Sequence, residues 1–468
     1  MTDTPASTGP SRDPLAAALD VARLVRAHGG RALIVGGWVR DRLLGRASKD
    51  IDLEVFGLDA APLRALLERI GPVNTVGESF TVYKVHDLDV ALPRRESKTG
   101  RGHRGFEVTG DPRLSPAEAA RRRDFTINAI AWDPLSDAYE DPFDGRGDLA
   151  RRVLRAVDTA TFGDDSLRVL RAVQFAARFD LTLDETTAAL CRALPLDDLP
   201  AERVWGEVEK LLLQAARPST GLALALDLGV VARLWPECLA LVGCPQEPHW
   251  HPEGDVWTHT LQVVDEARAR IDNLSRPQRV AVMLGAIAHD FGKPATTAMV
   301  DGRIRSLGHE EAGVEPADRF LDRLNVHTME GYDVRRQVLG LVAHHLKPGA
   351  WHKAASGVGD GAFRRLALKV DLDLLARLAE ADCVGRRPGT FDCSAMGWFL
   401  DRARMLGVQH RAPARLLLGR HLLALDVPPG PGMGRILDAV YERQLDGEVT
   451  TVDEALAAAR ALIAAAPG

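Results

Sequence analysis

Two carboxylates, Asp50 and Asp52, are separated by a single residue within Lys49–Phe56, a segment in which apolar and polar residues alternate. The strand period of two places both carboxylates on one face, while Ile51 points into the core. Paired oxygen ligands suit Mg²⁺, and two ions about 3.5–4 Å apart are the usual device for in-line phosphoryl displacement. An exposed acidic strand face has the same pattern, so the pair needs support from its context.

A glycine pair supplies part of that context. Gly36 and Gly37 lie between an expected strand, Ala32–Val35, and an expected helix that contains Arg40. Glycine lets the backbone approach phosphate oxygens, and a helix N-terminus favours anions. The guanidinium of Arg40 adds a fork of donors for phosphate. Gly37 and Arg40 are therefore candidate phosphate ligands, although a glycine pair alone also makes an ordinary tight turn.

Basic residues are concentrated in one region. Residues 93–123 contain nine Lys and Arg against four Asp and Glu, in a chain whose net charge is −6. This net charge excludes a generally polybasic protein but not a nucleic-acid partner, because binding depends on where positive charge is concentrated. The region ends with Arg123, a candidate phosphate ligand, and Asp124 and Asn128 follow at helical spacing. A charged helix start would explain the same residues.

A third polar group consists of Asp165, Arg168 and Arg171, spaced three residues apart in a segment with helical periodicity. This spacing predicts that all three share one helix face. A carboxylate acceptor beside a guanidinium donor can hydrogen-bond the Watson–Crick edge of a base, so the protein would replace a template strand. A surface ion pair has the same spacing. The alternating segment Thr81–Leu92 predicts another strand, and Asp89 within it is either a third metal carboxylate or a solvated strand residue.

Histidines and aspartates of metal-ligand type lie further along the chain. His259 is in a helical stretch, the doublet His289-Asp290 follows an apolar run, and Asp382 ends another helical segment. A lone histidine on a helix is commonly a core residue, but a buried carboxylate is costly without a cation or a donor. The doublet therefore favours a metal site. Three more histidines either reach a substrate phosphate or a second ion, or lie exposed in loops: His309, His344 and His345.

The elements that position these residues form a small α/β head followed by a long helical body. Leu15–His28 has helical spacing, the strands named above follow, and from about residue 149 the pattern is helical almost throughout. Pro- and Gly-rich breaks at 243–252 and 386–389 indicate further boundaries. A length of 468 residues fits two to four domains.

Composition narrows the class of protein. Five cysteines without CxxC spacing argue against a disulfide framework and a structural zinc site. The polar N-terminus lacks the apolar core of a signal peptide, and no run of about 18 apolar residues predicts a membrane span. We expect a cytoplasmic protein with no membrane partner, and the sequence sets no oligomeric state.

The motifs jointly resemble the class II tRNA nucleotidyltransferase and poly(A) polymerase superfamily, of the bacterial type with a fused HD domain. The resemblance extends over roughly the first half of the chain, in the family's order. Its pieces are VGGWVRDRLLG at 35–45, KDIDLEVFG at 49–57, RRRDFTINAIAWDP at 121–134, FGDDSLRVLRAVQFAARF at 162–179 and ERVWGEVEKLL at 202–212.

The resemblance implies a role for each matching residue. Asp50 and Asp52 would bind Mg²⁺ as the catalytic pair. The nucleotide ligands for CTP or ATP would be Gly37, Arg40, Arg123, Asp165, Arg168 and Arg171. The segment PRRESKTGRGHRG at 93–105 is similar to the flexible loop that family members need to add the final A, which weighs against an enzyme that adds only CC.

The second cluster resembles the HD-domain phosphohydrolases. By that resemblance two histidines and two aspartates bind a transition-metal ion such as Mn²⁺, Ni²⁺ or Co²⁺, in agreement with mixed nitrogen and oxygen ligation. The implied ligands are His259, His289, Asp290 and Asp382. Hydrolysis of phosphate esters stays open, and so does a structural metal or an inactive domain that helps to hold tRNA.

We therefore expect an α+β protein with a nucleotidyltransferase-type head and a mainly α-helical body containing an HD domain. The expected parts are a flexible leader (1–14), the head (15–148), a helical nucleotide- and tRNA-binding region (149–242), the HD domain (253–385) and a helical C-terminal region (390–468). The expected function is addition or repair of the 3′-terminal CCA of tRNA from CTP and ATP without a template.

Three rival functions remain at this point. One is an A-adding-only tRNA nucleotidyltransferase or a poly(A) polymerase, although residues 390–468 lack the strongly basic tail common in the latter. Another is a metal-dependent HD phosphohydrolase with a degenerate head. The third is a non-catalytic tRNA-binding protein, which would not need the metal carboxylates Asp50 and Asp52.

Overall fold

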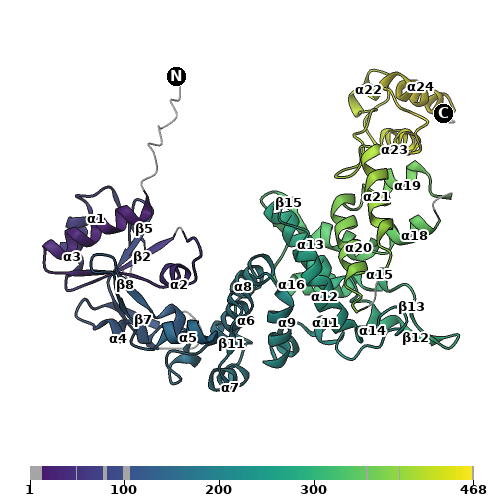
Figure 1. The fold of residues 1–468 in the computed structure, drawn as a ribbon. Helices are drawn as coiled ribbons and strands as arrows, with labels where there is room; N and C mark the ends of the chain where they lie inside the picture. Colours follow the sequence, from purple (N-terminus) through teal and green to yellow (C-terminus); the bar gives the residue numbers. More distant parts are fainter. Residues whose placement is uncertain are drawn as a thin grey trace, which may run out of the picture. The chain divides into compact units, whose positions relative to one another are not determined.

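The computed structural model describes residues 13–48, 50–76, 82–98, 106–354, 357–388 and 391–465. The chain divides into two compact units, residues 1–203 and 204–468. The first unit contains the α/β head and the second is mainly helical, which confirms the expected fold class (Figure 1). The expected leader lies almost wholly outside the described residues.

A seven-stranded sheet forms the centre of the first unit, in the order β3-β4-β5-β2-β1-β8-β9. The buried strand β1 pairs antiparallel with β2, and β2 pairs parallel with β5. The strands of this sheet are β1 (Arg31–Val35), β2 (Ile51–Phe56), β3 (Val73–Val76), β4 (Val82–Val85), β5 (Leu88–Ala91), β8 (Ala131–Asp133) and β9 (Ala138–Glu140).

Helices pack on this sheet through faces that the sequence pattern predicts. Helix α1 (Pro14–Ala27) buries an apolar stripe at helical spacing, including Val21 and Val25. The remaining elements of the unit are α2 (Gly37–Leu43), α3 (Ala60–Leu67), β6 (Arg94–Lys98), β7 (Phe106–Gly110), α4 (Pro116–Arg121), η1 (Thr126–Asn128), α5 (Gly145–Arg151), β10 (Val153–Leu154), η2 (Phe162–Asp164), α6 (Leu167–Phe179), β11 (Thr182–Leu183) and α7 (Glu185–Ala193).

Three local expectations were wrong. The described part of the alternating segment Thr81–Leu92 forms two strands, β4 and β5, because a turn at His86, whose φ is 52°, reverses the chain. Asp124 and Asn128 do not share a helix, since α4 ends at Arg121. Asp165 precedes α6, so it cannot share a helix face with Arg168.

The second unit is built around α13, all of whose residues from Val280 to Ala288 are buried. Such an apolar helix belongs at the centre of a core, and α12, α17 and α20 pack around it. The principal helices of the second unit are α12 (Val256–Arg268), α13 (Arg276–Ala288), α16 (Val314–Arg323), α17 (Val334–His344), α20 (Leu372–Val384) and α21 (Ser394–Met405).

The remaining elements precede or connect these helices. They are α8 (Ala201–Gln214), which crosses the boundary between the units, α9 (Pro218–Asp227), α10 (Val230–Leu234), α11 (Pro236–Leu239), α14 (Lys293–Thr296), β12 (Thr297–Val300), β13 (Arg303–Ser306), α15 (His309–Ala312), β14 (Thr328–Met329), β15 (Tyr332–Asp333), α18 (Lys347–Lys353) and α19 (Asp360–Leu366). The last three helices, α22 (Gly419–Leu423), α23 (Pro431–Asp446) and α24 (Val452–Ala465), share an apolar core of their own that includes Leu422 and Val440.

A disulfide between Cys383 and Cys393 differs from the expectation drawn from the cysteine count. It joins the end of α20 to the start of α21, two segments ten residues apart. The other three cysteines, Cys191, Cys238 and Cys244, are buried. Among the described helices, none combines the length and the apolar character needed to cross a membrane.

Candidate functional site

The first candidate site lies at the start of strand β2, where Asp50 and Asp52 are both exposed. In the sheet register Asp52 pairs with Val35 of β1 on one side and with Asp89 of β5 on the other. Asp89 therefore lies beside Asp52. The carboxylate of Asp89 forms an ion pair with Lys84, with Oδ1 and Nζ 2.9 Å apart. The structure thus brings together the three acidic residues singled out from the sequence.

The glycine pair lies directly beside these carboxylates. Gly36 has φ 75°, a conformation that favours glycine. A Cβ atom built on Gly36 would lie 3.8 Å from Oδ2 of Asp52 and 3.1 Å from Nη1 of Arg123. Gly37 begins α2, and a Cβ there would lie 3.5 Å from Nη2 of Arg40. The absence of side chains keeps open a space bordered by a carboxylate and a guanidinium.

The donor set of this space suits a magnesium ion. Although Asp52 reaches solvent, the protein around its carboxylate partly desolvates it and raises its pKa above the usual value. Arg123 opposes this effect, and the charges of Asp89 and Asp50 reinforce it. Neighbouring carboxylates that repel one another are stabilised together by a divalent cation. The residues present therefore fit Mg²⁺.

Arg123 is held in place by a residue that the sequence reasoning missed. Nη2 of Arg123 lies 3.2 Å from Oε1 of Glu54, and Nη2 of Arg122 donates to the same oxygen at 2.7 Å. Glu54 is only 5% exposed. It occupies the next position of the period-two series that starts with Asp50 and Asp52, so the alternation already indicated that it lies on their side of β2.

We expect Glu54→Gln to destabilise the first unit. Loss of the charge leaves two guanidinium groups without their shared anionic acceptor, a cost of about 2 kcal/mol. For a unit of this size the melting temperature should fall by about 4–8 °C in calorimetry. The exposed Glu68, which pairs with Arg64 four residues away, is the matched control. Glu68→Gln should cost less than about 0.5 kcal/mol, and an equal loss in both variants would contradict this role of Glu54.

Arg40 is buried in a network of polar groups. It donates through Nη1 to Oδ1 of Asn128 at 2.7 Å and through Nε and Nη2 to Asp41, and it stacks over the ring of Phe179. Burial lowers the pKa of Arg40 below its usual value. The candidate phosphate ligand Arg40 therefore already has protein partners for its guanidinium.

The network continues to Arg171. Asn128 donates through Nδ2 to Oδ1 of Asp124 at 3.0 Å, and Arg171 donates through Nε to Oδ2 of Asp124 at 2.7 Å. Burial opposes the charge of Asp124, but Arg171 and the hydrogen bonds hold its pKa below the usual value. The network links Arg40 to Arg171, and both guanidinium groups lie over the ring of Phe175.

Asp165 and Arg168, the expected base readers, have separate partners. Arg203 donates to both oxygens of Asp165, at 2.8 and 3.3 Å. Arg168 donates to the backbone oxygens of Thr161 and Arg122 at 2.9 and 2.7 Å. Sequence spacing pairs Asp165 with Arg168, whereas the structure pairs it with Arg203, a contact between segments 38 residues apart that local spacing cannot reveal.

The second candidate site lies in the core of the second unit. His259 belongs to α12, His289 and Asp290 directly follow α13, and Asp382 belongs to α20. Nε2 of His259 lies 3.1 Å from Oδ1 of Asp382 and 3.9 Å from Oδ2 of Asp290. Nε2 of His289 lies 3.1 Å from the same oxygen of Asp290. All four residues expected from the sequence converge and are buried.

Two further histidines extend the cluster on the other side of Asp290. Nε2 of His309 lies 3.3 Å from Oδ1 of Asp290 and 3.3 Å from Nε2 of His345. Burial and the nearby imidazoles lower the pKa of His345 to about 3. His344 belongs neither to the group of His259, His289 and Asp382 nor to the group of Asp290, His309 and His345. Asp290 thus belongs to two adjoining clusters and offers one oxygen to each.

The orientation of the rings leaves their lone pairs directed at one another. Nδ1 donates to a backbone oxygen three residues earlier in each of His289, His309 and His345, at 2.7–2.9 Å. In the neutral form Nε2 is then an acceptor. Nε2 of His289 is buried and lies 3.1 Å from Oδ2 of Asp290, an oxygen that also pairs with Lys293. Converging acceptors of this kind need a cation, and the mixed nitrogen and oxygen donors fit a divalent transition metal.

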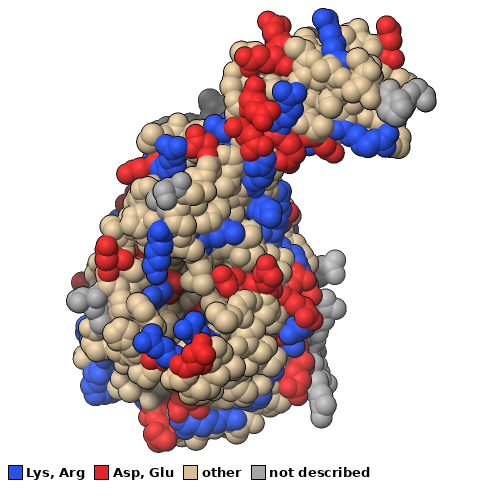
Figure 2. Space-filling model, turned by 90° about the vertical axis from the view of Figure 1, so that its right-hand side faces the viewer, with Lys and Arg blue, Asp and Glu red and all other residues tan. Residues whose placement is uncertain are grey.

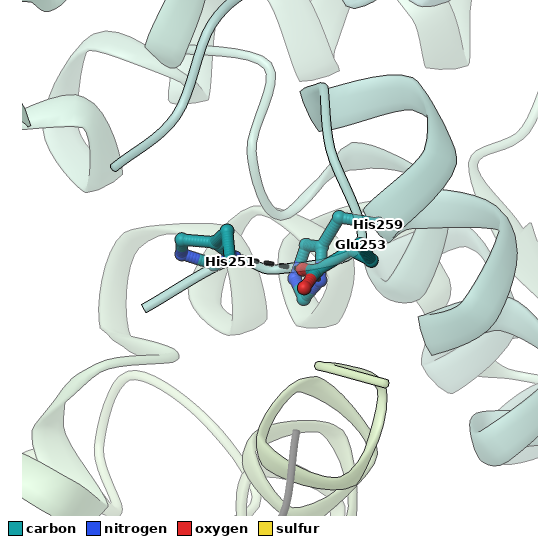
Figure 3. A group of neighbouring side chains, drawn as sticks. All are labelled: His251, Glu253 and His259. Carbon is teal, nitrogen blue, oxygen red and sulfur yellow. Dashed lines mark hydrogen bonds and ion pairs between the residues drawn. The ribbon is translucent and has the colours of Figure 1, made fainter. Parts of the chain in front are cut away.

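Glu253 and His251 adjoin the cluster from the segment before α12 (Figure 3). Oε1 of Glu253 accepts from Nδ1 of His251 at 2.8 Å and lies 2.7 Å from Nδ1 of His259. The side chain of Glu253 is fully shielded from solvent. Burial opposes its charge, yet the two histidines lower the pKa of Glu253 to about 2.

A cavity of about 750 Å³ opens onto the second site. Its wall contains the buried Asp290, His309, His345 and Asp382, together with Lys293, Arg386 and His251. Lys293 pairs with Asp290 at 2.7 Å, and Arg386 pairs with Asp382 at 3.3 Å. A cavity with cationic side chains beside a metal-type cluster suits an anionic substrate such as a phosphate ester.

Two family models match the chain. The poly(A) polymerase head domain matches residues 32–155, and the HD domain matches residues 256–384. The first match contains Asp50, Asp52 and Arg123, and the second contains His259 and Asp382.

Whole-chain relatives agree with this combination. A multifunctional CCA protein of Xanthomonas campestris pv. campestris is 36% identical over 421 residues, 86% of this chain and 95% of that protein. One of Halorhodospira halophila is 41% identical over 300 residues, 62% of this chain and 68% of that protein.

The fold is also that of a solved structure. The Bacillus stearothermophilus CCA-adding enzyme in complex with CTP has a TM-score of 0.62 at 23% identity, covering 97% of this chain and 98% of that one. At this identity the likeness concerns the fold alone. The extent and identity of the match to curated relatives establish that the chain belongs to the family of multifunctional CCA proteins, with a poly(A) polymerase-type head and an HD domain.

Proposed function

We propose that the chain builds or repairs the 3′-terminal CCA of tRNA from CTP and ATP without a nucleic-acid template. The observation that carries this proposal is the grouping of Asp50, Asp52, Gly36 and Arg123. The chain that contains this group matches a multifunctional CCA protein over 95% of that protein's length. The solved structures of similar fold include CCA-adding enzymes in complex with CTP, ATP and tRNA.

The proposed reaction is an in-line nucleotidyl transfer. The terminal 3′-hydroxyl of the tRNA attacks the α-phosphorus of the bound nucleotide, and pyrophosphate leaves. Asp50 and Asp52 would hold Mg²⁺, which when bound supplies positive charge at the reacting phosphate. The open backbone at Gly36 and Gly37 admits the triphosphate, and Arg123 donates to its oxygens. Glu54 keeps Arg123 at this place.

The proposed readers of the base are Asp165 and Arg168, with Arg171 as a further nucleotide ligand. A carboxylate and a guanidinium together offer the acceptor and donors that the edges of cytosine and adenine require. Arg203 contacts both oxygens of Asp165, so we add it as the residue that orients this carboxylate. Arg40, which lies beside Gly37 and donates to Asn128, would support the nucleotide site through these contacts.

The C-terminal region favours CCA addition over poly(A) synthesis. Residues 390–468 contain eight arginines and no lysine against nine Asp and Glu. On the face drawn in Figure 2, Lys and Arg side chains are interspersed with Asp and Glu. A strongly basic RNA-binding tail is therefore not encoded there. Of the segment 93–105, which resembles the loop for the final A, residues 99–105 lie outside the described residues.

Product length on defined substrates tests this proposal. We expect purified protein to extend a tRNA without its tail by three nucleotides when CTP and ATP are both present, and by two with CTP alone. A tRNA ending in CC should accept one residue from ATP only. Sequencing gels with each labelled nucleotide give the result. Addition of A alone would establish the A-adding rival, and a long adenylate ladder would establish the poly(A) polymerase.

We propose as a second activity that the HD domain hydrolyses phosphate esters. The observation that favours it is the buried cluster of acceptors at the wall of a cavity with Lys293 and Arg386. The ligands for one ion of the Mn²⁺, Ni²⁺ or Co²⁺ type would be the converging group His259, His289 and Asp382, joined by Asp290, whose Oδ2 lies 3.1 Å from Nε2 of His289. The group Asp290, His309 and His345 would adjoin a second ion. When bound, such ions supply Lewis acidity and an activated water. Lys293 and Arg386 would bind the phosphate.

The proposed parts of the chain remain the head (15–148), the helical region (149–242), the HD domain (253–385) and the C-terminal region (390–468). Matches to the family models at 32–155 and 256–384 support the two catalytic parts. We propose the cytoplasm as the compartment, because it holds the tRNA, CTP and ATP that the reaction consumes.

A further inference from the structure

The segment just before α12 carries a carboxylate that contacts the metal-type cluster without belonging to it. Glu253 lies two residues before Asp255, whose side chain caps α12 by accepting from the backbone nitrogen of Thr258. Asp255 also accepts from the backbone nitrogen of Gly243 at 2.6 Å. The segment is thus fixed at the end of the helix that carries His259, and Figure 3 shows the Glu253 side chain directed at that histidine.

One oxygen of Glu253 serves two histidines. Oε1 lies 2.8 Å from Nδ1 of His251 and 2.7 Å from Nδ1 of His259, and the two rings are nearly perpendicular, with centroids 4.9 Å apart. His251 lines the cavity, whereas His259 is fully buried and directs Nε2 towards Asp382 and Asp290. The same carboxylate therefore links a histidine of the cavity wall to a histidine of the cluster.

His259 differs from the other cluster histidines in this contact. His289, His309 and His345 each direct Nδ1 at a neutral backbone oxygen, whereas Nδ1 of His259 faces the carboxylate of Glu253 at 2.7 Å. A carboxylate on the outer nitrogen of a ligand histidine fixes the tautomer and raises the donor strength of the inner nitrogen. Of the cluster histidines, His259 is therefore the one whose Nε2 should donate its electron pair most strongly to a metal ion.

Burial of Glu253 makes a purely incidental contact costly. A shielded carboxylate is expensive unless hydrogen bonds or charges compensate it. Here the compensation comes from His251 and His259, while Oε2 makes no hydrogen bond with described residues. Glu253 is thus a buried carboxylate that contacts the nitrogen of His259 facing away from the cluster. This is the position of an outer-sphere partner of a metal ligand.

We infer that Glu253 is a positioning residue for the HD site, which orients His259 for cation binding and anchors His251 at the wall of the substrate cavity. The inference rests on the proposed binding of a divalent transition metal by the HD cluster. Removal of such outer-sphere partners lowers metal affinity by about 10–100-fold.

Cobalt affinity of the full-length protein tests the inference. Co²⁺ is titrated at one fixed pH in excess Mg²⁺, which occupies carboxylate sites such as that in the head but competes poorly for imidazole. Visible absorption reports Co²⁺ bound to histidine nitrogen. We expect Glu253→Gln, which keeps the shape and removes the charge, to weaken Co²⁺ binding by about tenfold or more and to change the absorption spectrum. Excess Co²⁺ should restore hydrolysis by this variant.

The matched control is Glu247→Gln. Glu247 lies in the same segment, but its carboxylate accepts from the backbone nitrogen of Ile304. This variant should bind Co²⁺ within about twofold of the wild type. Glu253→Asp, which keeps the charge but shortens the side chain, should lie between wild type and Glu253→Gln, and it provides the test if the glutamine variant does not fold.

The outcomes separate the inference from the function on which it rests. If the wild type does not bind Co²⁺ through histidine, the proposed HD activity is wrong and the inference falls with it. If the wild type binds Co²⁺ and the folded Glu253 variants bind equally well with an unchanged spectrum, the HD proposal stands and the positioning role is refuted.

Discussion

Asp52→Asn lowers the rate of nucleotide incorporation into tRNA by about a thousandfold. The substitution keeps the size of the side chain but removes one of the two charges that face the nucleotide, and the loss of a metal carboxylate costs about 4 kcal/mol of transition-state stabilisation. Asp50→Asn is expected to behave alike. Single-turnover incorporation of labelled CTP, with enzyme in excess over tRNA, measures the chemical step.

The control for this prediction is Asp87→Asn. Asp87 is an exposed carboxylate in the turn between β4 and β5 of the same sheet. It should retain the wild-type rate within about twofold, because surface substitutions away from the site have small effects. A wild-type rate in Asp52→Asn, with an unchanged melting temperature, would show that the β2 carboxylates are not the catalytic pair.

Asp290→Asn is expected to abolish phosphate-ester hydrolysis while CCA addition persists. Asp290 contributes to both adjoining clusters, so its loss removes an anionic ligand from each. We expect hydrolysis of p-nitrophenyl phosphate, assayed with Co²⁺ or Ni²⁺, to fall by at least about a thousandfold. Incorporation of CTP should be unaffected, because the carboxylates of that reaction belong to the other compact unit.

Asp301→Asn serves as the control for the second prediction, since Asp301 is exposed in the turn between β12 and β13. Circular dichroism establishes that the buried substitution leaves the helices folded. Hydrolysis retained in a folded Asp290→Asn variant would contradict the assignment of the cluster as the hydrolytic centre. Loss of both activities together would contradict the independence of the two sites.

Local periodicity predicted the parts of the head that depend on nearest neighbours. The alternation around Asp50 and Asp52 predicted β2, and the glycine pair predicted the turn between β1 and α2. The same alternation reaches Glu54, whose role became visible only through its contacts with Arg122 and Arg123, 68 and 69 residues away in the chain.

The contacts that no spacing rule could predict join distant segments. Asp165 pairs with Arg203 and not with Arg168, because α6 begins at Leu167 and leaves Asp165 outside its regular face. His259 and Asp382 meet although 123 residues separate them. Their convergence was expected from family resemblance, since helix packing and not sequence periodicity brings α12 and α20 together.

The role of Glu253 could not be predicted from the sequence. A glutamate in a loop before a helix has no periodic signal, and the residues 251–255 read as an ordinary polar connection. Only its burial and its contacts with two histidines distinguish it. Outer-sphere residues of this kind are set by tertiary packing around the ligands and therefore escape analysis of local pattern.

The location of a metal ion in the head decides whether Asp50 and Asp52 form the catalytic pair. Crystals of the protein grown with CTP and Mn²⁺, as an anomalously scattering substitute for Mg²⁺, reveal the ion independently of any model of the ligand. We expect an anomalous peak between the carboxylates of Asp50 and Asp52, with the triphosphate against Gly36, Gly37 and Arg123. A nucleotide bound with its metal elsewhere, and no peak at these two carboxylates, would contradict the assignment of Asp50 and Asp52 as the catalytic metal ligands.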